Sequence, residues 1–448
     1  MSLQSCVLDL RLKPDLSAGA GGKYGRMFPD LAPLHCEEKD LLALGRAGSA
    51  LDVTVDDPSS DNPKIPAGHT MFGHMLAHDL TADRSLLAAH ASLRRIHNFR
   101  TPALNFESLY GLGPSGAPYM YDADDPDKFL LGVDETGARS DVPRNSQGRA
   151  LIGDPRNDVH HIIVQLHLVM LKLHNRFVER VRDEGAAAHD VFGQAQRNLR
   201  WHLQWIVLNE FLPLTVGDDL MRDIVRNGRR FFRPAHSYIP VEFADAAYRF
   251  GHAQVRVTYR LNERTRAAVY PDLAGGRSLP SAHVVDWRRF FALDAESGPQ
   301  ASKRIEPRVA HTLIDLPESV VGQTPLPEFH SLACRDLTRA RALNLPSGET
   351  IARHIGAQPL TPAEVGLGDY GWRSETPLWY YILKEASVRH NGERLGEVGG
   401  TIVAEVLSGV IDADPTSYRS ADPAWVPVLP SRQGGRFTLA DAVASATA

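Results

Sequence analysis

The sequence is poor in the features that mark several large classes of protein. It has three cysteines in 448 residues, Cys6, Cys36 and Cys334, and no CxxC pair. We therefore expect neither a zinc knuckle nor a thioredoxin-type site, and the low, odd count is typical of a reducing compartment. No segment approaches the roughly 18 uncharged apolar residues of a membrane span, and the start, MSLQSCVLDLRLKPD, lacks a signal-peptide core. These absences predict a cytoplasmic protein with no membrane span.

An excess of positive charge is also missing. The chain has 49 basic and 54 acidic residues, which gives a formal net charge of −5. There is no basic arm or lysine-rich tail, so nucleic acid is not an expected partner.

What the sequence does contain is helical patterning between irregular segments. Residues 1–66 are rich in glycine and proline and predict a wrapping arm. Helical spacing begins at residue 67 and continues to 96, and residues 97–156 are again irregular. The remainder, 67–448, predicts one large helical domain, because no stretch alternates strands with helices. We expect a mostly α fold with long irregular loops.

The clearest predicted helix covers residues 157–182. Its apolar stripe, Ile162, Leu166, Val169 and Leu173, continues at the same spacing onto Arg176. Further helices are predicted near 194–212, near 241–256 and at several places in 283–448.

An arginine at a position that faces the core needs a partner, because a buried unpaired guanidinium is very costly. One interpretation is a structural pair between Arg176 and Glu179, three residues on. The other is that Arg176 points into a cavity that holds an anion or a reacting oxygen.

Two histidine segments also have the spacing of a site. His74 and His78 lie one helical turn apart, so they can share a metal, or one can be a core residue and the other a surface residue. Asp79 faces another direction. His252 follows Gly251, which would let a flat group approach the backbone closely, although a lone helical histidine is more often a core residue.

Together these segments resemble the peroxidase–cyclooxygenase superfamily of haem enzymes, and most closely its bacterial peroxidase branch. The resemblance is collinear over most of the chain, in the blocks IPAGHTMFGHMLAHDLT, NFRTPALNFESLYG, KFLLG, ALIGDPRND, QLHLVMLKLHNRFVE, AAYRFGHAQVR, ARALNLPSG, TPLWYYILKEA and VGGTIVAEVL. It implies a single helical domain of the animal haem peroxidase type, with haem b between central helices.

The resemblance implies a role for each segment. His78 would be the distal base and His252 the proximal iron ligand, and Arg176, in the HNR triplet, would be the distal arginine. Arg249 and Arg339 are natural partners for the haem propionates, since guanidinium pairs well with carboxylate.

A calcium ion is implied beside the distal histidine. Its ligands would all offer oxygen, as calcium requires: Asp79, Thr101, Ala103 through its carbonyl, Asn105 and Glu107. The family has aspartate at the position of Asn105 and aspartate or serine at that of Glu107, so the implied site is altered.

The activity implied is a haem-dependent peroxidase. Hydrogen peroxide would be cleaved to a ferryl intermediate that oxidises a small organic donor. A neutral imidazole above the iron can take a proton from one peroxide oxygen and return it to the other. A fixed cation nearby would stabilise the charge on the departing oxygen.

Three positions depart from the family pattern on which this expectation rests. His74, included among the catalytic residues, replaces a glutamine, and Ala77 replaces an aspartate that forms an ester with haem. At most one ester is then expected, through Glu179. Asp336 replaces an asparagine at the proximal histidine, where it would push the imidazole toward imidazolate. It could instead pair with Arg339.

Two other functions fit the same sequence. One is a biosynthetic haem oxidase or dioxygenase, although the radical tyrosine of cyclooxygenases would fall on Arg249, and Tyr248 is one residue out of register. The other is a non-catalytic haem-binding protein. We expect a monomer or a homodimer.

Overall fold

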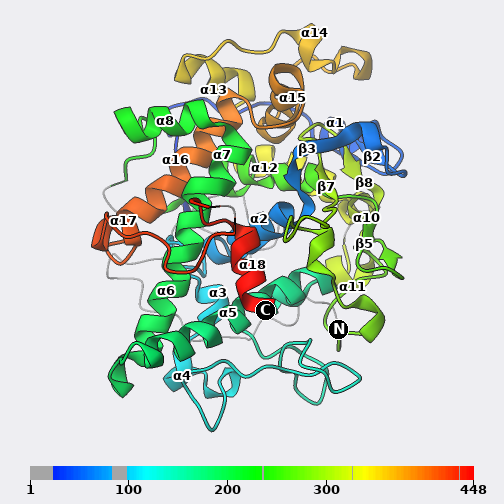
Figure 1. The fold of residues 1–448 in the computed structure, drawn as a ribbon. Helices are drawn as coiled ribbons and strands as arrows, with labels where there is room; N and C mark the ends of the chain where they lie inside the picture. The colour runs from blue at the N-terminus through cyan, green and yellow to red at the C-terminus, as the bar shows by residue number, and fades with distance from the viewer. Residues whose placement is uncertain (1–23, 83–97, 235–236, 325, 433, 448) are drawn as a thin grey trace.

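The computed structural model describes residues 24–82, 98–234, 237–324, 326–432 and 434–447, and its framework is helical (Figure 1). Among these residues, the helices of at least eight residues are α1 (Glu38–Gly45), α2 (Ala67–Leu80), α5 (His161–Asp183), α6 (Val191–Ile206), α8 (Asp218–Asn227), α12 (Leu332–Ala342), α13 (Gly348–Ile355), α15 (Leu378–His390), α16 (Glu397–Ala413) and α18 (Leu439–Thr447). Shorter α-helices are α3 (Glu107–Tyr110), α4 (Gly113–Gly116), α7 (Leu212–Val216), α9 (Val241–Ala244), α10 (His311–Ile314), α11 (Glu318–Val321), α14 (Pro362–Val365) and α17 (Tyr418–Ala421). The predicted mostly α fold is confirmed.

Strands in the described residues form only short two-stranded ladders. The parallel pairs are β1 (Tyr24–Gly25) with β4 (Ile239–Pro240), and β2 (Asp52–Val53) with β8 (Val309–Ala310). The antiparallel pairs are β3 (Asp61–Pro66) with β7 (Ala301–Lys303), and β5 (Tyr259–Arg260) with β6 (Arg266–Ala267). Three of these ladders fasten the first described segments onto later parts of the chain.

Helix α5 is the long helix predicted at 157–182, and it begins four residues later. Residues 155–158 form the 3₁₀ turn η5 (Pro155–Asp158), and the side chain of His160 caps α5 by accepting the N–H of Ile163. The first eleven residues of α5 are all buried, so this half is a core helix, whereas its second half is amphipathic. Arg180 and Arg182 in the last turn complement the helix dipole.

The helix predicted near 241–256 is two short elements. Helix α9 is followed by the 3₁₀-helix η8 (Ala247–Gln254), which carries His252. A 3₁₀-helix has three residues per turn, so side chains three apart lie one above the other. Arg249 and His252 therefore share one side of η8, and Tyr248 lies on another.

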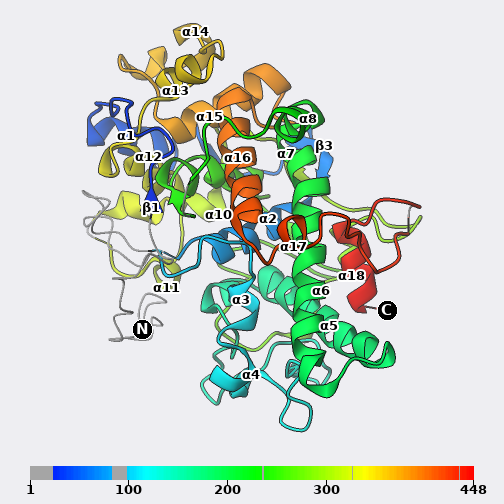
Figure 2. The same cartoon turned by 90° about the vertical axis from the view of Figure 1, so that its left-hand side faces the viewer.

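Helix α2 lies near the middle of the molecule in both Figure 1 and Figure 2, where it packs against α5 and η8. Helices α15 and α16 also pack on η8, and α12 packs on α15. The predicted helical stretch 67–96 is described only in part: α2 ends at Leu80, and 83–97 lie outside the described residues.

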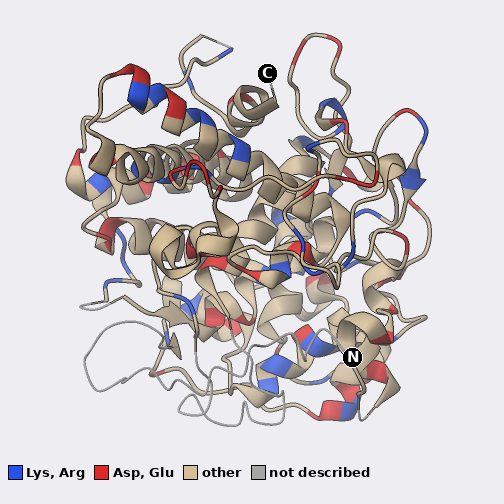
Figure 3. Cartoon of the chain, turned by 90° about the horizontal axis from the view of Figure 1, so that it is seen from below, with Lys and Arg blue, Asp and Glu red and all other residues tan. Residues whose placement is uncertain are grey.

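Basic and acidic segments are interspersed over the face of the chain shown in Figure 3. Within the part of the chain that the structure describes, no helix combines the length and the apolarity that crossing a bilayer requires.

Candidate active site

Helices α2 and η8 each present one partly accessible stripe in the interior of the molecule. On α2 the stripe is Gly73, His74 and Ala77. On η8 it includes Gly251 and His252, and a Cβ added at Gly251 would meet no atom within 4 Å. Burial, followed by the nearby charges of His252 and Arg156, lowers the pKa of His74 to about 3. The two stripes are therefore close neighbours, with open space at the glycine.

On the η8 side, His252 is held by a buried carboxylate from α12. Its Nδ1 lies 2.5 Å from Asp336 Oδ2, and Asp336 Oδ1 accepts a hydrogen bond of 3.3 Å from Arg249. Burial alone would raise the pKa of Asp336, but His252, Arg249 and Arg339 together hold it below its usual value. Asp336 is thus an anion that accepts a hydrogen bond from Nδ1 of His252. The other ring nitrogen of His252, Nε2, stays available.

The sequence left a choice between His252 and Arg339 as the partner of Asp336, and the direct contact is with His252. Arg339 is hydrogen-bonded to Asp245, which also lies 3.5 Å from Arg249. Arg249 and Arg339, which were predicted to meet the haem propionates, therefore lie beside Asp245 and Asp336 on the η8 side.

On the α2 side, His78 is fixed by Asn157 of η5. The His78 Nδ1 lies 2.8 Å from Asn157 Oδ1, and Asn157 Nδ2 lies 3.0 Å from His167 Nδ1. Because Oδ1 can only accept, Nδ1 of His78 carries the proton and Nε2 holds a lone pair. Burial, followed by the nearby charges of His74 and Arg156, lowers the pKa of His78 well below 6.5. His78 is a neutral imidazole with a free basic nitrogen.

A cation lies beside His78, but it is Arg156 and not the predicted Arg176. Its Nη2 donates to the carbonyl oxygen of His78 at 2.8 Å and to Asp154 at 2.7 Å. Asp154 is buried and also binds Arg100; burial would raise its pKa, but Arg156 and Arg100 hold it well below its usual range. An anchored carboxylate thus fixes the guanidinium next to His78.

The prediction that Arg176 is the distal arginine is wrong. Arg176 is exposed and hydrogen-bonds the carbonyl of Ser445 in α18. It follows His160 by 16 residues along α5, which is about 24 Å at 1.5 Å per residue. Phe177, and not Arg176, continues the buried stripe beyond Leu173.

The roles given to Glu179 fail for the same reason. Its side chain is 63% exposed and pairs with Lys128 at 3.3 Å, so it neither pairs with Arg176 nor lies near the stripes of α2 and η8. The expected ester through Glu179 therefore has no structural basis.

Sequence reasoning also missed His160. Its ring lies 5.6 Å from that of His74, which in turn lies 4.4 Å from that of His78. Burial lowers the pKa of His160 well below 6.5. Three neutral imidazoles thus gather here, two from α2 and one from the cap of α5. The block ALIGDPRND contained Arg156 and Asn157, but its irregular backbone gives no periodicity from which to read a side chain's direction.

Four of the five implied calcium donors lie on one loop, and the fifth, Asp79, lies on α2. Glu107 accepts from the Thr101 hydroxyl and from Asn105 at 2.8 Å, and the Thr101 carbonyl accepts the N–H of Ala103 at 2.7 Å. Asp79 accepts backbone N–H groups of the same loop, from Phe106 at 2.8 Å and Ser108 at 3.0 Å. Burial raises the pKa of Asp79 to about 6. Among the described residues, no three histidine, cysteine or acidic side chains are grouped to hold a metal.

Comparison with known proteins matches part of the chain to haem peroxidases. The model of the animal haem peroxidase family matches residues 118–288. A curated haem peroxidase 2 from Caenorhabditis elegans is 35% identical over 130 residues, which are 27% of this chain and 18% of that protein. Human thyroid peroxidase is 26% identical over 137 residues, 30% of this chain and 15% of that protein. The chain thus spans less than a fifth of these relatives.

Solved structures extend the likeness over the whole fold. Peroxidase A from Dictyostelium discoideum superposes with a TM-score of 0.69 at 14% identity, over 96% of this chain and 94% of that one. A fatty acid alpha-dioxygenase from Oryza sativa gives a TM-score of 0.62 at 14% identity, over 89% of this chain and 76% of that one. The chain therefore has the helical fold of these peroxidase and dioxygenase structures, and its residues 118–288 match the animal haem peroxidase family.

Proposed function

We propose that the protein binds haem b between α2 and η8 and uses hydrogen peroxide to oxidise a small organic donor. The observation that carries this proposal is the unlike state of two histidines on the packed neighbours α2 and η8. His78 is neutral with a free basic nitrogen, and His252 is bound to an anionic carboxylate.

The residues present fit a haem. Open space at Gly251 admits a flat group, and Gly73 and Ala77 keep the opposite stripe free of large side chains. His252 would ligate the iron through Nε2, with Asp336 on its other nitrogen strengthening its donation. Arg249 and Arg339 lie on the same side and would receive the propionates, with Asp245 as their present partner.

A bound haem would supply the redox chemistry for the cleavage of peroxide. His78 would take a proton at Nε2 from one peroxide oxygen and return it to the other. Asn157 keeps the other nitrogen protonated, so Nε2 is available throughout. Arg156, anchored by Asp154, would offset the negative charge that develops on the departing oxygen. His74 and His160 would line the pocket for the organic donor.

We propose that the haem is held without an ester bond. In the family the glutamate that forms the ester stands three residues after the distal arginine. With Arg156 in that role, the position is Val159, which has no carboxyl group.

Calcium in the loop of Thr101 and Glu107 remains a proposal, supported by the oxygen-bearing side chains that converge there. A fall in the melting temperature on addition of EGTA would support it. An unchanged melting curve at any calcium concentration would contradict it.

A second candidate is an oxidase or dioxygenase, and Tyr248 is the observation that favours it. Its ring stacks on Phe243 at 4.7 Å between centroids, and its buried hydroxyl has no partner among the described residues. That hydroxyl lies 3.9 Å from where a Cβ on Gly73 would stand. Uptake of dioxygen with an organic substrate, lost in Tyr248→Phe, would favour this candidate over the peroxidase.

Titration of the purified chain with haemin tests the proposal. We expect a Soret band at one haem per chain. The variant His252→Ala should lose the histidine-ligated spectrum, and His189→Ala, a surface histidine, should keep it. Peroxide should then oxidise a phenolic donor only with the haem-loaded wild type and the control. A chain that takes up no haem would end the proposal.

A further inference from the structure

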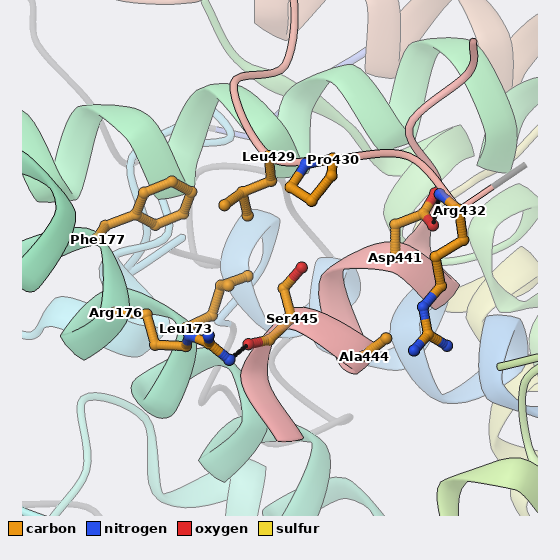
Figure 4. Close-up of a pocket in the computed structure, with 9 residues that line it drawn as sticks. All are labelled: Leu173, Arg176, Phe177, Leu429, Pro430, Arg432, Asp441, Ala444 and Ser445. Atoms are coloured by element: carbon orange, nitrogen blue, oxygen red, sulfur yellow. Dashed lines mark hydrogen bonds between the residues drawn. The ribbon is translucent and has the colours of Figure 1, made fainter. Parts of the chain in front are cut away.

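A cavity lies on the second half of α5, beside Arg176. It has a volume of about 240 Å³ and is lined by α5, the segment 429–432 and α18 (Figure 4). Its apolar lining is Leu173, Phe177, Leu429, Pro430 and Ala444. Leu173 and Phe177 are at most 1% exposed, so the floor of the cavity is part of the core.

Two guanidinium groups also line this cavity. Arg176 binds the Ser445 carbonyl and Arg432 binds the Leu293 carbonyl, each through Nη1. Neither makes an ion pair with a carboxylate within the described ranges. The other charged lining residue, Asp441, accepts the N–H of Arg432 at 2.9 Å and both donors of Thr438, as the cap of α18.

On α5, the absence of a carboxylate partner among the described residues distinguishes Arg176 from the arginines that follow it. The neighbouring arginines of α5 have carboxylate partners: Arg180 pairs with Glu184 at 2.8 Å, and Arg182 pairs with Asp125 at 2.7 Å. An alternative is that the sole role of Arg176 is to hold the last turn of α18, whose carbonyls lack helical partners. That role uses one of its nitrogens and does not account for Arg432 beside the same apolar floor.

We propose that this cavity binds a small organic anion with an apolar body, such as a short-chain or aromatic carboxylate. The carboxylate would meet the unpaired guanidinium nitrogens, for which it has matching geometry. The apolar body would lie on Leu173 and Phe177. The volume is below the range of 300–1,000 Å³ that is common for ligand and cofactor sites, so the ligand is small. The site is separate from the proposed haem site, about 24 Å away along α5.

Calorimetric titration of the full-length, haem-loaded protein with octanoate tests this site. We expect one site with a dissociation constant on the order of 0.1–1 mM. Arg176→Gln and Arg432→Gln should each weaken binding about tenfold, and Arg180→Gln, on the same helix but outside the cavity, should not change it. Octanamide, which has the same body without the charge, should bind at least tenfold more weakly than octanoate.

The Soret spectrum is recorded during the titration, so that binding at the haem is recognised separately. Circular dichroism melting of each variant shows whether α18 has stayed in place. Absence of binding up to 10-fold above the expected range would overturn the proposal. Equal binding by wild type and both cavity variants, or a spectral shift that accounts for all the binding, would do the same. None of these outcomes depends on whether the protein is a peroxidase.

Discussion

Neutralising Arg156 should slow the reaction with peroxide, and neutralising Arg176 should not. Arg156 donates to the carbonyl of His78, so its charge lies beside this residue, and we take a separation of about 5 Å from an oxygen held at His78 Nε2. At an effective dielectric constant of about 20, a unit charge at that distance is worth about 3 kcal/mol. Losing it corresponds to a fall of about 200-fold in rate. Arg176 is about 24 Å away and exposed, so at the dielectric constant of water, about 80, its contribution is about 0.2 kcal/mol before salt screening.

Stopped-flow mixing of the haem-loaded protein with peroxide measures this rate through the change in the Soret band. Arg156→Gln and Arg176→Gln are the matched pair. In Arg156→Gln the buried Asp154 still has Arg100 as a partner, so the fold should survive, and an unchanged melting curve would verify it. A rate for Arg156→Gln within threefold of wild type, or an equal loss in Arg176→Gln, would refute the assignment of the distal cation.

Three further predictions follow from the same structure. Asp336→Asn removes the anion from His252 and should raise the haem reduction potential by on the order of 100 mV, measured by spectroelectrochemistry. Acid–acetone should extract all haem from wild type and from Glu179→Gln alike; haem that stays with the wild type alone would contradict the absence of an ester. Burial lowers the pKa of His167 to about 3 and of His174 to about 4, so below pH 6.5 the unfolded state takes up protons that the folded state does not. Each should therefore cost about 2 kcal/mol of stability between pH 7.5 and 5.0, measured by urea unfolding, and an equal stability at both pH values would contradict this.

The helical class could be predicted because it depends on periodicity, and α5 shows why the same signal misplaced a residue. The spacing of buried residues along an α-helix is 3.6, so the place after Leu173 is either Arg176 or Phe177. The stripe fits both positions, and burial of the larger apolar side chain decides in favour of Phe177. Sequence spacing therefore located the helix correctly but could not determine which of two adjacent residues faces the core.

The residues around His78 were missed for a different reason. Arg156 and Asn157 lie in the 3₁₀ turn before α5, and His160 is the cap itself. The directions of Arg156 and Asn157 depend on how that turn packs against α2, through their bonds to His78. Such contacts join residues about 80 positions apart in the chain, and no local pattern encodes them. His252 and Asp336 are equally distant in sequence, and they were found only because a resemblance to known proteins linked them.

The two sides of the proposed haem site place opposite demands on a histidine, and the chain meets each with a different acceptor. A base above the iron must keep a lone pair, so a charged neighbour would harm it by stabilising imidazolium. Asn157, a neutral acceptor, orients His78 without adding negative charge. A ligand below the iron gains donor strength from a full negative charge, and Asp336 provides one. The amide of Asn157 lets His78 act as the base, and the carboxylate of Asp336 lets His252 act as the ligand. The reverse assignment would hold a proton where the reaction needs a vacant nitrogen.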